Sequence, residues 1–127
     1  MAEYVGGNEA PQDAPKITVS SLTFTRGDLA YFSSGTPTAC GDGTDCELLV
    51  TEDCAITDTE LNVIWLKDGD LLWIDYTGAT TNVKTGDYVD FADETTIDAT
   101  DETAGVERLQ VMAIDSANSR MLIRYRG

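Results

Sequence analysis

Apolar and polar residues alternate with a period of two along most of the chain that follows Lys16. In the run RMLIRYR (120–126), Met121, Ile123 and Tyr125 fall on one face, whereas three arginines and a leucine fall on the other. Side chains of a β-strand point to its two faces in turn, so this pattern predicts strands. We expect strands at 17–24, 29–32, 47–52, 62–67, 71–76, 88–91, 95–99, 106–114 and 120–126.

Helical periodicity is missing, and residues 52–61 can form at most one short helical turn. The step Asp68-Gly69-Asp70 stands between two apolar runs, which predicts a β-hairpin of 62–67 with 71–76. The Thr-rich run 95–99 is expected to form a short strand at the edge of a sheet.

The end of the chain predicts a second hairpin. Five turn-forming residues, 115–119, join two alternating runs. In the first of these runs, Leu109, Val111 and Ala113 are expected to share one face.

Together these patterns predict an all-β fold. We expect a small β-barrel or β-sandwich with an extended N-terminal arm and a C-terminal β-hairpin. Residues 1–15 contain two of the three prolines, a Gly-Gly pair and several acidic residues, which favours a flexible arm. Residues 16–127 are expected to form a single β domain.

Three Gly-Asp steps each lead into an apolar run, and the first belongs to the tripeptide Arg26-Gly27-Asp28 that adhesion receptors recognise on some extracellular proteins. Glycine supplies the positive φ that tight turns need, and aspartate accepts hydrogen bonds from turn amides. We interpret the three steps as structural turns. A turn explains all three Gly-Asp steps, whereas an adhesion motif would explain only the first. The turn residues are Gly27, Asp28, Gly69, Asp70, Gly86 and Asp87.

The charge of the chain narrows the classes of function. Its 127 residues include 23 acidic and 8 basic side chains, a net charge of −15. Phosphate binding requires clustered cations, so we expect neither nucleic acid nor a membrane surface as a partner. Histidine is absent, which removes the commonest general base and metal ligand. We therefore expect no enzyme and assign no catalytic residue. The N-terminus lacks the apolar core of a signal peptide, which predicts synthesis in the cytoplasm.

The cysteines and the acidic loops do not form a recognisable ligand set. Cys40, Cys46 and Cys54 lack a CxxC step and a fourth ligand, so no metal ligand is assigned. Three reduced thiols are the preferred interpretation, although one pair could bridge. The loop CGDGTDCE (40–47) offers oxygen ligands for Ca²⁺ but departs from the EF-hand order, and a solvated turn is preferred. The cluster DETTIDATDE (93–102) is interpreted as a charged sheet edge, and no cofactor is assigned.

Charge is also unevenly distributed. Four of the eight basic residues lie between positions 108 and 126, after an acidic stretch at 85–107. The arginines can pair internally across strands, or with the acidic segment of another copy. The candidate intermolecular contacts are Arg26, Arg108, Arg120, Arg124 and Arg126.

Three segments resemble the capsid decoration, or cement, proteins of tailed bacteriophages. They read LKDGDLLWIDYTG, VKTGDYVDFADETTIDATDE and VERLQVMAIDSANSRMLIRYRG, and they cover roughly 62–127. The resemblance implies a β domain on the capsid exterior, often trimeric, with an N-terminal arm along the shell and with neither catalysis nor cofactor. We therefore expect a virion protein that binds the major capsid protein, forms a homo-oligomer (a trimer) and stabilises the head.

A second hypothesis is an adhesin-like or carbohydrate-binding β module, Ca²⁺-dependent in one version. It would use Trp65 and Trp73 together with the nearby acidic residues Asp68, Asp70 and Asp75.

Overall fold

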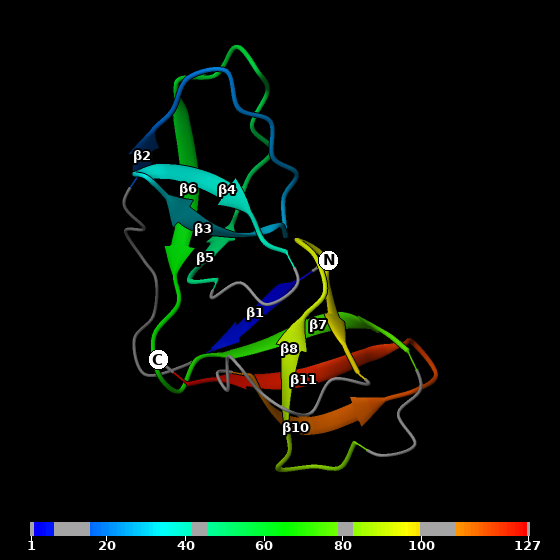
Figure 1. Cartoon of the computed structure of the whole chain (residues 1–127). Coiled ribbons are helices and arrows are strands. Elements are labelled where there is room, and N and C mark those ends of the chain that lie inside the picture. Colours follow the sequence, from blue (N-terminus) through cyan, green and yellow to red (C-terminus); the bar gives the residue numbers. More distant parts are fainter. Residues whose placement is uncertain (1, 7–15, 42–45, 79–82, 100–108, 127) are drawn as a thin grey trace.

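The computed structural model describes residues 2–6, 16–41, 46–78, 83–99 and 109–126. Within these residues the chain forms eleven strands and no helix, which confirms the all-β class. Figure 1 shows two parts, a barrel and a five-stranded sheet above it. The strands are β1 (Glu3–Gly6), β2 (Lys16–Thr18), β3 (Leu29–Ser33), β4 (Thr36–Ala39), β5 (Leu48–Val50), β6 (Glu60–Trp65), β7 (Leu71–Thr77), β8 (Tyr88–Phe91), β9 (Thr96–Asp98), β10 (Leu109–Asp115) and β11 (Arg120–Tyr125).

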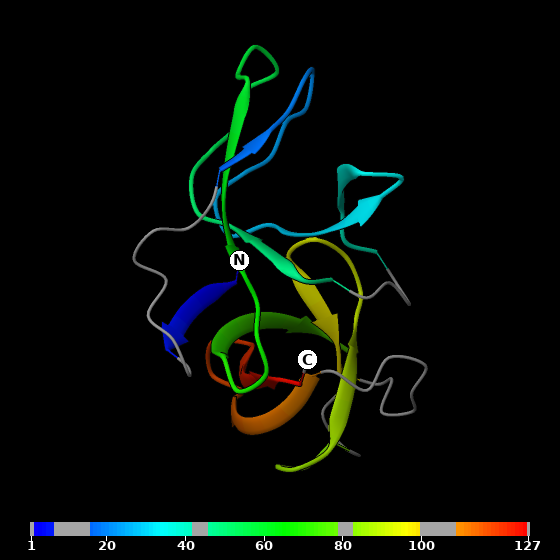
Figure 2. The ribbon, with the colours of Figure 1, turned by 90° about the vertical axis from the view of Figure 1, so that its left-hand side faces the viewer.

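The barrel is a mixed sheet that closes on itself. Its strands follow the order β7-β11-β10-β8-β9, and a parallel pairing of β9 with β7 completes the ring. Figure 2 shows β7, β10 and β11 curving around it. The sequence predicts an edge strand at 95–99, and that prediction is wrong, because β9 pairs with both β8 and β7. This closure leaves no open edge around the ring.

Alternate residues of the barrel strands fill its interior. Met121, Ile123 and Tyr125 are buried together with Leu72 and Ile74 of β7. The C-terminal hairpin is confirmed by the antiparallel pairing of β10 with β11.

A bulge in β10 changes the predicted face of one residue. The register with β11 shifts between Val111 and Ala113, so Ala113 pairs with Leu122 on the outer face. The expectation that Ala113 shares a face with Leu109 and Val111 is therefore wrong. An extra residue in one strand reverses the alternation beyond it. Met112 at the bulge is exposed.

The predicted hairpin around Asp68-Gly69-Asp70 does not form. β6 belongs to the five-stranded sheet and β7 to the barrel, so the turn connects the two parts. Its backbone is bonded instead to the end of β11: the Gly69 amide donates to the Tyr125 carbonyl, and the Tyr125 amide donates to the Asp70 carbonyl, both at 2.8 Å. The predicted Gly-Asp turn therefore forms. The segment that pairs with it is set by the tertiary fold and not by the local sequence.

The five-stranded sheet is antiparallel throughout, in the order β2-β6-β5-β3-β4. The strand expected at 17–24 is shorter and ends at Thr18. An additional strand, β4, forms at Thr36–Ala39, outside the strands that the sequence predicts. Pro37 lacks an amide donor and is tolerated because β4 lies at the sheet edge. The helical turn allowed at 52–61 is a β-turn in which the Asp58 amide donates to the Ala55 carbonyl at 2.9 Å.

The described part of the N-terminal arm is paired and packed against the barrel. β1 pairs with the first half of β7, and Ala2 is buried. The Tyr4 hydroxyl donates to Asp70 Oδ1 at 3.3 Å, and burial together with this carboxylate raises the pKa of Tyr4. The expectation of a free arm is corrected for residues 2–6, because Ala2 and Tyr4 gain apolar burial there. Residues 7–15 lie outside the described residues, and the division at residue 15 stays a prediction.

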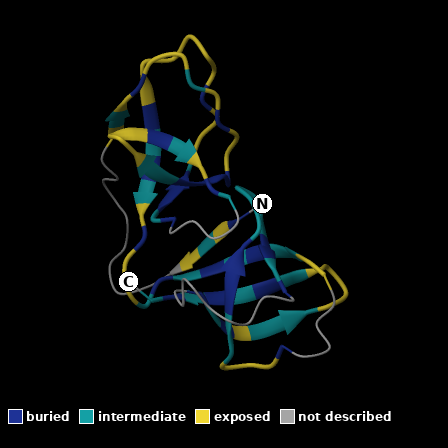
Figure 3. Cartoon of the chain, in the orientation of Figure 1, coloured by how far each residue is buried: buried dark blue, intermediate teal, exposed yellow. Residues whose placement is uncertain are grey.

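The two faces of the five-stranded sheet have different roles. Leu29, Leu49 and Leu66 point into the core that the sheet shares with the barrel. Leu48 and Val50 belong to a separate outer cluster with Phe24 and Cys54 from the connecting segments. Figure 3 shows that the loops at the end away from the barrel are exposed.

Candidate functional site

All three Gly-Asp steps form the same turn. The glycines have φ of 92°, 94° and 99°, in the left-handed region that favours glycine. In each turn the aspartate Oδ2 accepts the amide hydrogen of the residue three positions earlier. The pairs are Thr25 to Asp28 at 2.8 Å, Lys67 to Asp70 at 2.8 Å, and Lys84 to Asp87 at 2.9 Å.

Each turn is also fixed to a neighbouring segment by two backbone hydrogen bonds. The glycine amide donates to a carbonyl, and the amide of that same partner residue donates to the aspartate carbonyl, at 2.7–2.8 Å. The turn therefore ends one strand and positions the next. The partners are Val50 for Gly27-Asp28, Tyr125 for Gly69-Asp70, and Val111 for Gly86-Asp87.

This geometry explains the Arg26-Gly27-Asp28 tripeptide. Asp28 is 9% exposed and its carboxylate binds the turn amide, so it is not presented to solvent as a receptor ligand. Burial raises the pKa of Asp28 more than the Thr25 hydrogen bond lowers it, and the Glu94 carboxylate raises it further. Arg26 is exposed, and its backbone amide donates to Asp53 Oδ1 at 2.8 Å. Among the described residues its side chain has no ion pair.

Arg26 borders a groove at the junction of the barrel and the five-stranded sheet. The groove has a volume of about 510 Å³. β1 forms one side and the β5–β6 pair forms the other, with the first Gly-Asp turn at one margin. Its lining combines a guanidinium and a carboxylate with apolar side chains, and comprises Ala2, Glu3, Tyr4, Arg26, Gly27, Leu49, Val50, Thr51 and Ile64. Sequence reasoning identified Arg26 and missed the groove, since only the fold brings residues 2–4 next to residues 49–51.

The C-terminal arginines contact their own chain. The Arg120 guanidinium lies 4.7 Å from the Trp73 ring centroid, and its nitrogens lie 3.5 Å from Asp115 Oδ2 and 3.9 Å from Glu3 Oε2. Arg126 Nε lies 3.5 Å from Asp68 Oδ1. Arg120 and Arg126 therefore pair within their own chain, as the first of the two interpretations expects. Arg124 is half-buried on β11, and Arg108 lies outside the described residues.

The tryptophans are not brought together. Trp65 of β6 is 38% exposed, and its ring centroid lies 5.3 Å from that of Phe32. Trp73 of β7 lies beneath Arg120. A two-tryptophan platform therefore does not form.

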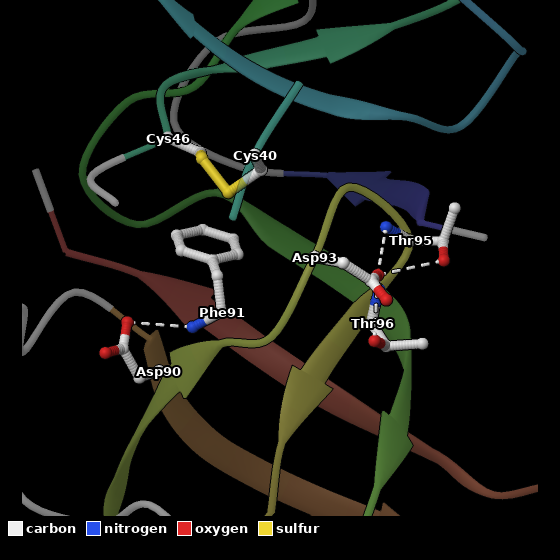
Figure 4. The surroundings of a disulfide bond; sticks show 7 residues. All are labelled: Cys40, Cys46, Asp90, Phe91, Asp93, Thr95 and Thr96. Carbon is white, nitrogen blue, oxygen red and sulfur yellow. Dashed lines mark hydrogen bonds between the residues drawn. A yellow bond between two sulfur atoms is a disulfide. The ribbon is translucent and has the colours of Figure 1, made fainter. Parts of the chain in front are cut away.

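A disulfide lies in the core that the barrel shares with the five-stranded sheet. Cys40 and Cys46 are bonded, with their Cα atoms 5.9 Å apart, so the expectation of three reduced thiols is wrong for this pair. Figure 4 shows the Phe91 ring of β8 pointing toward the bond. Cys54 is free and buried, and burial raises the pKa of its thiol, which disfavours the reactive thiolate. A single sequence cannot identify the bonded pair, because any two of three cysteines could pair.

Asp93 of the second acidic cluster caps a turn. Asp93 Oδ1 accepts hydrogen bonds from the amides and hydroxyls of Thr95 and Thr96, at 2.8–3.1 Å (Figure 4). Burial alone would raise the pKa of Asp93, but these hydrogen bonds hold it below its usual value. The described residues contain no group of three or more side chains placed to hold a metal ion. Asp42 and Asp45 of the proposed Ca²⁺ loop lie outside them.

Comparisons with protein-family models, curated proteins and solved structures find no match for this chain. A search of the described residues for helices long and apolar enough to cross a membrane also finds none.

Proposed function

We propose that the protein is a structural component of a virion, a decoration protein that binds the outside of a phage capsid and stabilises the head. The main support is that the segment resembling such proteins forms one structural unit. Residues 62–127 include every strand of the closed barrel, so the resemblance follows one structural unit rather than scattered turns. The strong acidic charge favours solubility and a cationic partner surface.

The groove beside Arg26 is the proposed contact with the major capsid protein. It joins a cation without an internal ion pair among the described residues to an apolar floor of Leu49 and Ile64. Arginine next to a desolvated apolar surface is a common anchor of protein interfaces. Arg120 and Arg126 are less suited to this role, because they contact acidic residues of their own chain.

The chain provides a matched pair of variants for the test. Arg26 and Thr85 occupy the same position in two turns of the same geometry. Arg26→Thr therefore removes the cation without disturbing the turn, and Thr85→Arg adds one elsewhere. In co-sedimentation with assembled capsids, Arg26→Thr is expected to weaken binding about tenfold or more, whereas Thr85→Arg binds as the wild type does.

The outcomes separate the site from the function. Unchanged binding by Arg26→Thr would reject the groove as the contact, and absence of wild-type binding would reject the decoration role. Size-exclusion chromatography with light scattering tests the proposed trimer, which a monomeric mass would contradict.

The exposed Trp65, whose ring lies beside the half-buried Phe32, favours a second candidate, a carbohydrate-binding module. Aromatic faces next to solvent bind the apolar faces of sugars. Trp65→Ala is then expected to abolish binding on a glycan array, whereas Trp73→Ala, which alters a ring covered by Arg120, does not. A melting temperature that rises in millimolar Ca²⁺ would support the Ca²⁺-dependent form, by linkage. Absence of glycan binding by the wild type would reject this candidate.

A further inference from the structure

Backbone contacts between the five-stranded sheet and the loop after β8 lie in one small region, which we call the seam. The Leu29 amide donates to the Glu94 carbonyl at 2.7 Å, and Gly41 forms a β-bridge with Asp93. On the sheet side the seam comprises Leu29, Cys40, Gly41 and Cys46, and on the barrel side Phe91, Asp93 and Glu94.

The Cys40–Cys46 disulfide fixes the sheet side of the seam. Cys40 follows β4 and Cys46 precedes β5, and these two strands lie on opposite sides of β3. The Cys40 amide donates to the Leu29 carbonyl at 2.9 Å, so the bond crosses the start of β3 next to the barrel contact. The disulfide thus ties the edge strand β4 to the interior of its sheet.

The bond is also part of the shared core. Cys40 is 3% exposed and Cys46 is 0% exposed, and both pack in the cluster that contains Phe91 and the barrel interior. Figure 4 shows Phe91 between the disulfide and the barrel strands, while the neighbouring Asp93 cap holds the loop to which Gly41 is bridged. Release of the two cysteines would therefore loosen the apolar contact and the backbone bridge together.

We infer that this disulfide is a redox-sensitive clamp on the seam. When the bond is closed, β4 and the seam are held against the barrel. When it is reduced, β4 and the seam open locally while the barrel remains folded. The barrel is independent of the clamp because its ring is closed by the β7–β9 pair, which contains no cysteine.

A dithiol such as dithiothreitol supplies the electrons for opening. Its thiolate attacks one protein sulfur, and the other cysteine leaves as a thiolate and takes a proton. The second thiol of the reagent then displaces the first cysteine, which leaves two protein thiols and the cyclic disulfide of the reagent. Because both sulfurs are buried, attack requires the seam to open first, so the rate of reduction reports that opening.

Amide hydrogen exchange of the full chain, with and without dithiothreitol, tests the clamp. The amides of Leu29 and Cys40 report the seam, and those of Val111 and Tyr125 report the barrel. Reduction is expected to speed exchange at the seam by up to about 50-fold, the chain-entropy value for a loop closed over a sequence separation of 6. Exchange at the two barrel amides is expected to change less than about twofold.

Two variants complete the experiment. Cys40→Ser with Cys46→Ser is expected to exchange at the reduced rates with or without reductant, and Cys54→Ser is expected to respond to the reductant as the wild type does. If the double variant does not fold, reduction of the folded wild type gives the same comparison. Equal acceleration of seam and barrel amides would overturn the clamp, since the disulfide would then stabilise the whole chain, and so would no acceleration at either.

Discussion

The barrel and the five-stranded sheet contain the same kind of short strands, but they differ in how these strands are covered. The barrel closes its ring through β9, and side chains such as Ile123 are fully buried inside it. The sheet leaves β2 and β4 at its edges and covers its outer cluster with connecting segments. Closure therefore pairs the strands of the ring with one another on both sides, whereas the sheet depends on the barrel and on its own loops to cover its two faces.

The largest expected difference concerns matched cavities in the two cores. Ile123→Ala in the barrel and Leu48→Ala in the outer cluster each remove a fully buried aliphatic side chain. We expect a loss of about 4 kcal/mol in the free energy of unfolding for Ile123→Ala and about 2 kcal/mol for Leu48→Ala, because loops can settle into a cavity more easily than a closed ring can. Urea denaturation followed by circular dichroism measures both. Equal losses would show that the loops pack as rigidly as the barrel.

A smaller difference is expected at two turn glycines. Gly86 of a barrel turn and Gly35 of the β3–β4 turn have φ of 99° and 80°, and a Cβ at either would meet nothing within 4 Å. Alanine at Gly86 is expected to lower the free energy of unfolding by about 1–2 kcal/mol through backbone strain alone. At Gly35 the loss should be smaller, because the β3–β4 end can fray to relieve that strain.

Gly41→Ala is the control for this pair. Gly41 has no positive φ and also has open space for a Cβ, so its replacement is expected to change stability by less than about 0.5 kcal/mol. A larger loss at Gly35 than at Gly86 would contradict the proposed difference between the two parts.

The smallest effect is a difference in pH dependence between two aspartates. The pKa of Asp93 is lowered, so its contribution is present above its unfolded pKa and is lost as pH falls through the folded pKa. The pKa of Asp28 is raised, so its contribution is complete below the unfolded pKa and is lost as pH rises through the folded pKa. Asp93→Asn should therefore reduce the loss of stability in acid, and Asp28→Asn should reduce the loss as pH rises. Urea denaturation midpoints of the wild type and of both variants, measured between about pH 2 and pH 6, test the two directions. Variant midpoints that follow the wild-type pH dependence in parallel would contradict them.

The sequence predicts most of this fold because alternation is a local signal. β3, β7, β8 and β11 lie where their apolar patterns place them, and all three Gly-Asp turns have the expected backbone. The errors concern long-range choices. The turn at Gly69-Asp70 predicts a hairpin, yet it bonds to Tyr125, and the polar run at Thr96–Asp98 closes the barrel rather than lining an edge. Which strand a turn meets depends on the whole topology, which a local pattern does not contain.

The candidate site was less predictable for the same reason. Arg26 could be selected because the other two turns have no cation at the position before glycine, but its groove exists only because β1 returns to β7. The disulfide joins two of three cysteines, and neither spacing nor composition distinguishes that pair. The internal roles of Arg120 and Arg126 required the positions of Asp115 and Asp68.

The pairing of β1 with β7 has a consequence for the order of events during synthesis. Tyr4 leaves the ribosome before its partner Asp70, which follows 66 residues later, and β11, which completes the ring, ends only at Tyr125. All five strands of this sheet precede β7 in the chain and end at Trp65, so they emerge before the ring of the barrel can close, but the inner face of the sheet stays uncovered until the barrel is made. The closed ring is therefore the later part of the native protein to be completed, and β1 is held in place only after β7 has emerged.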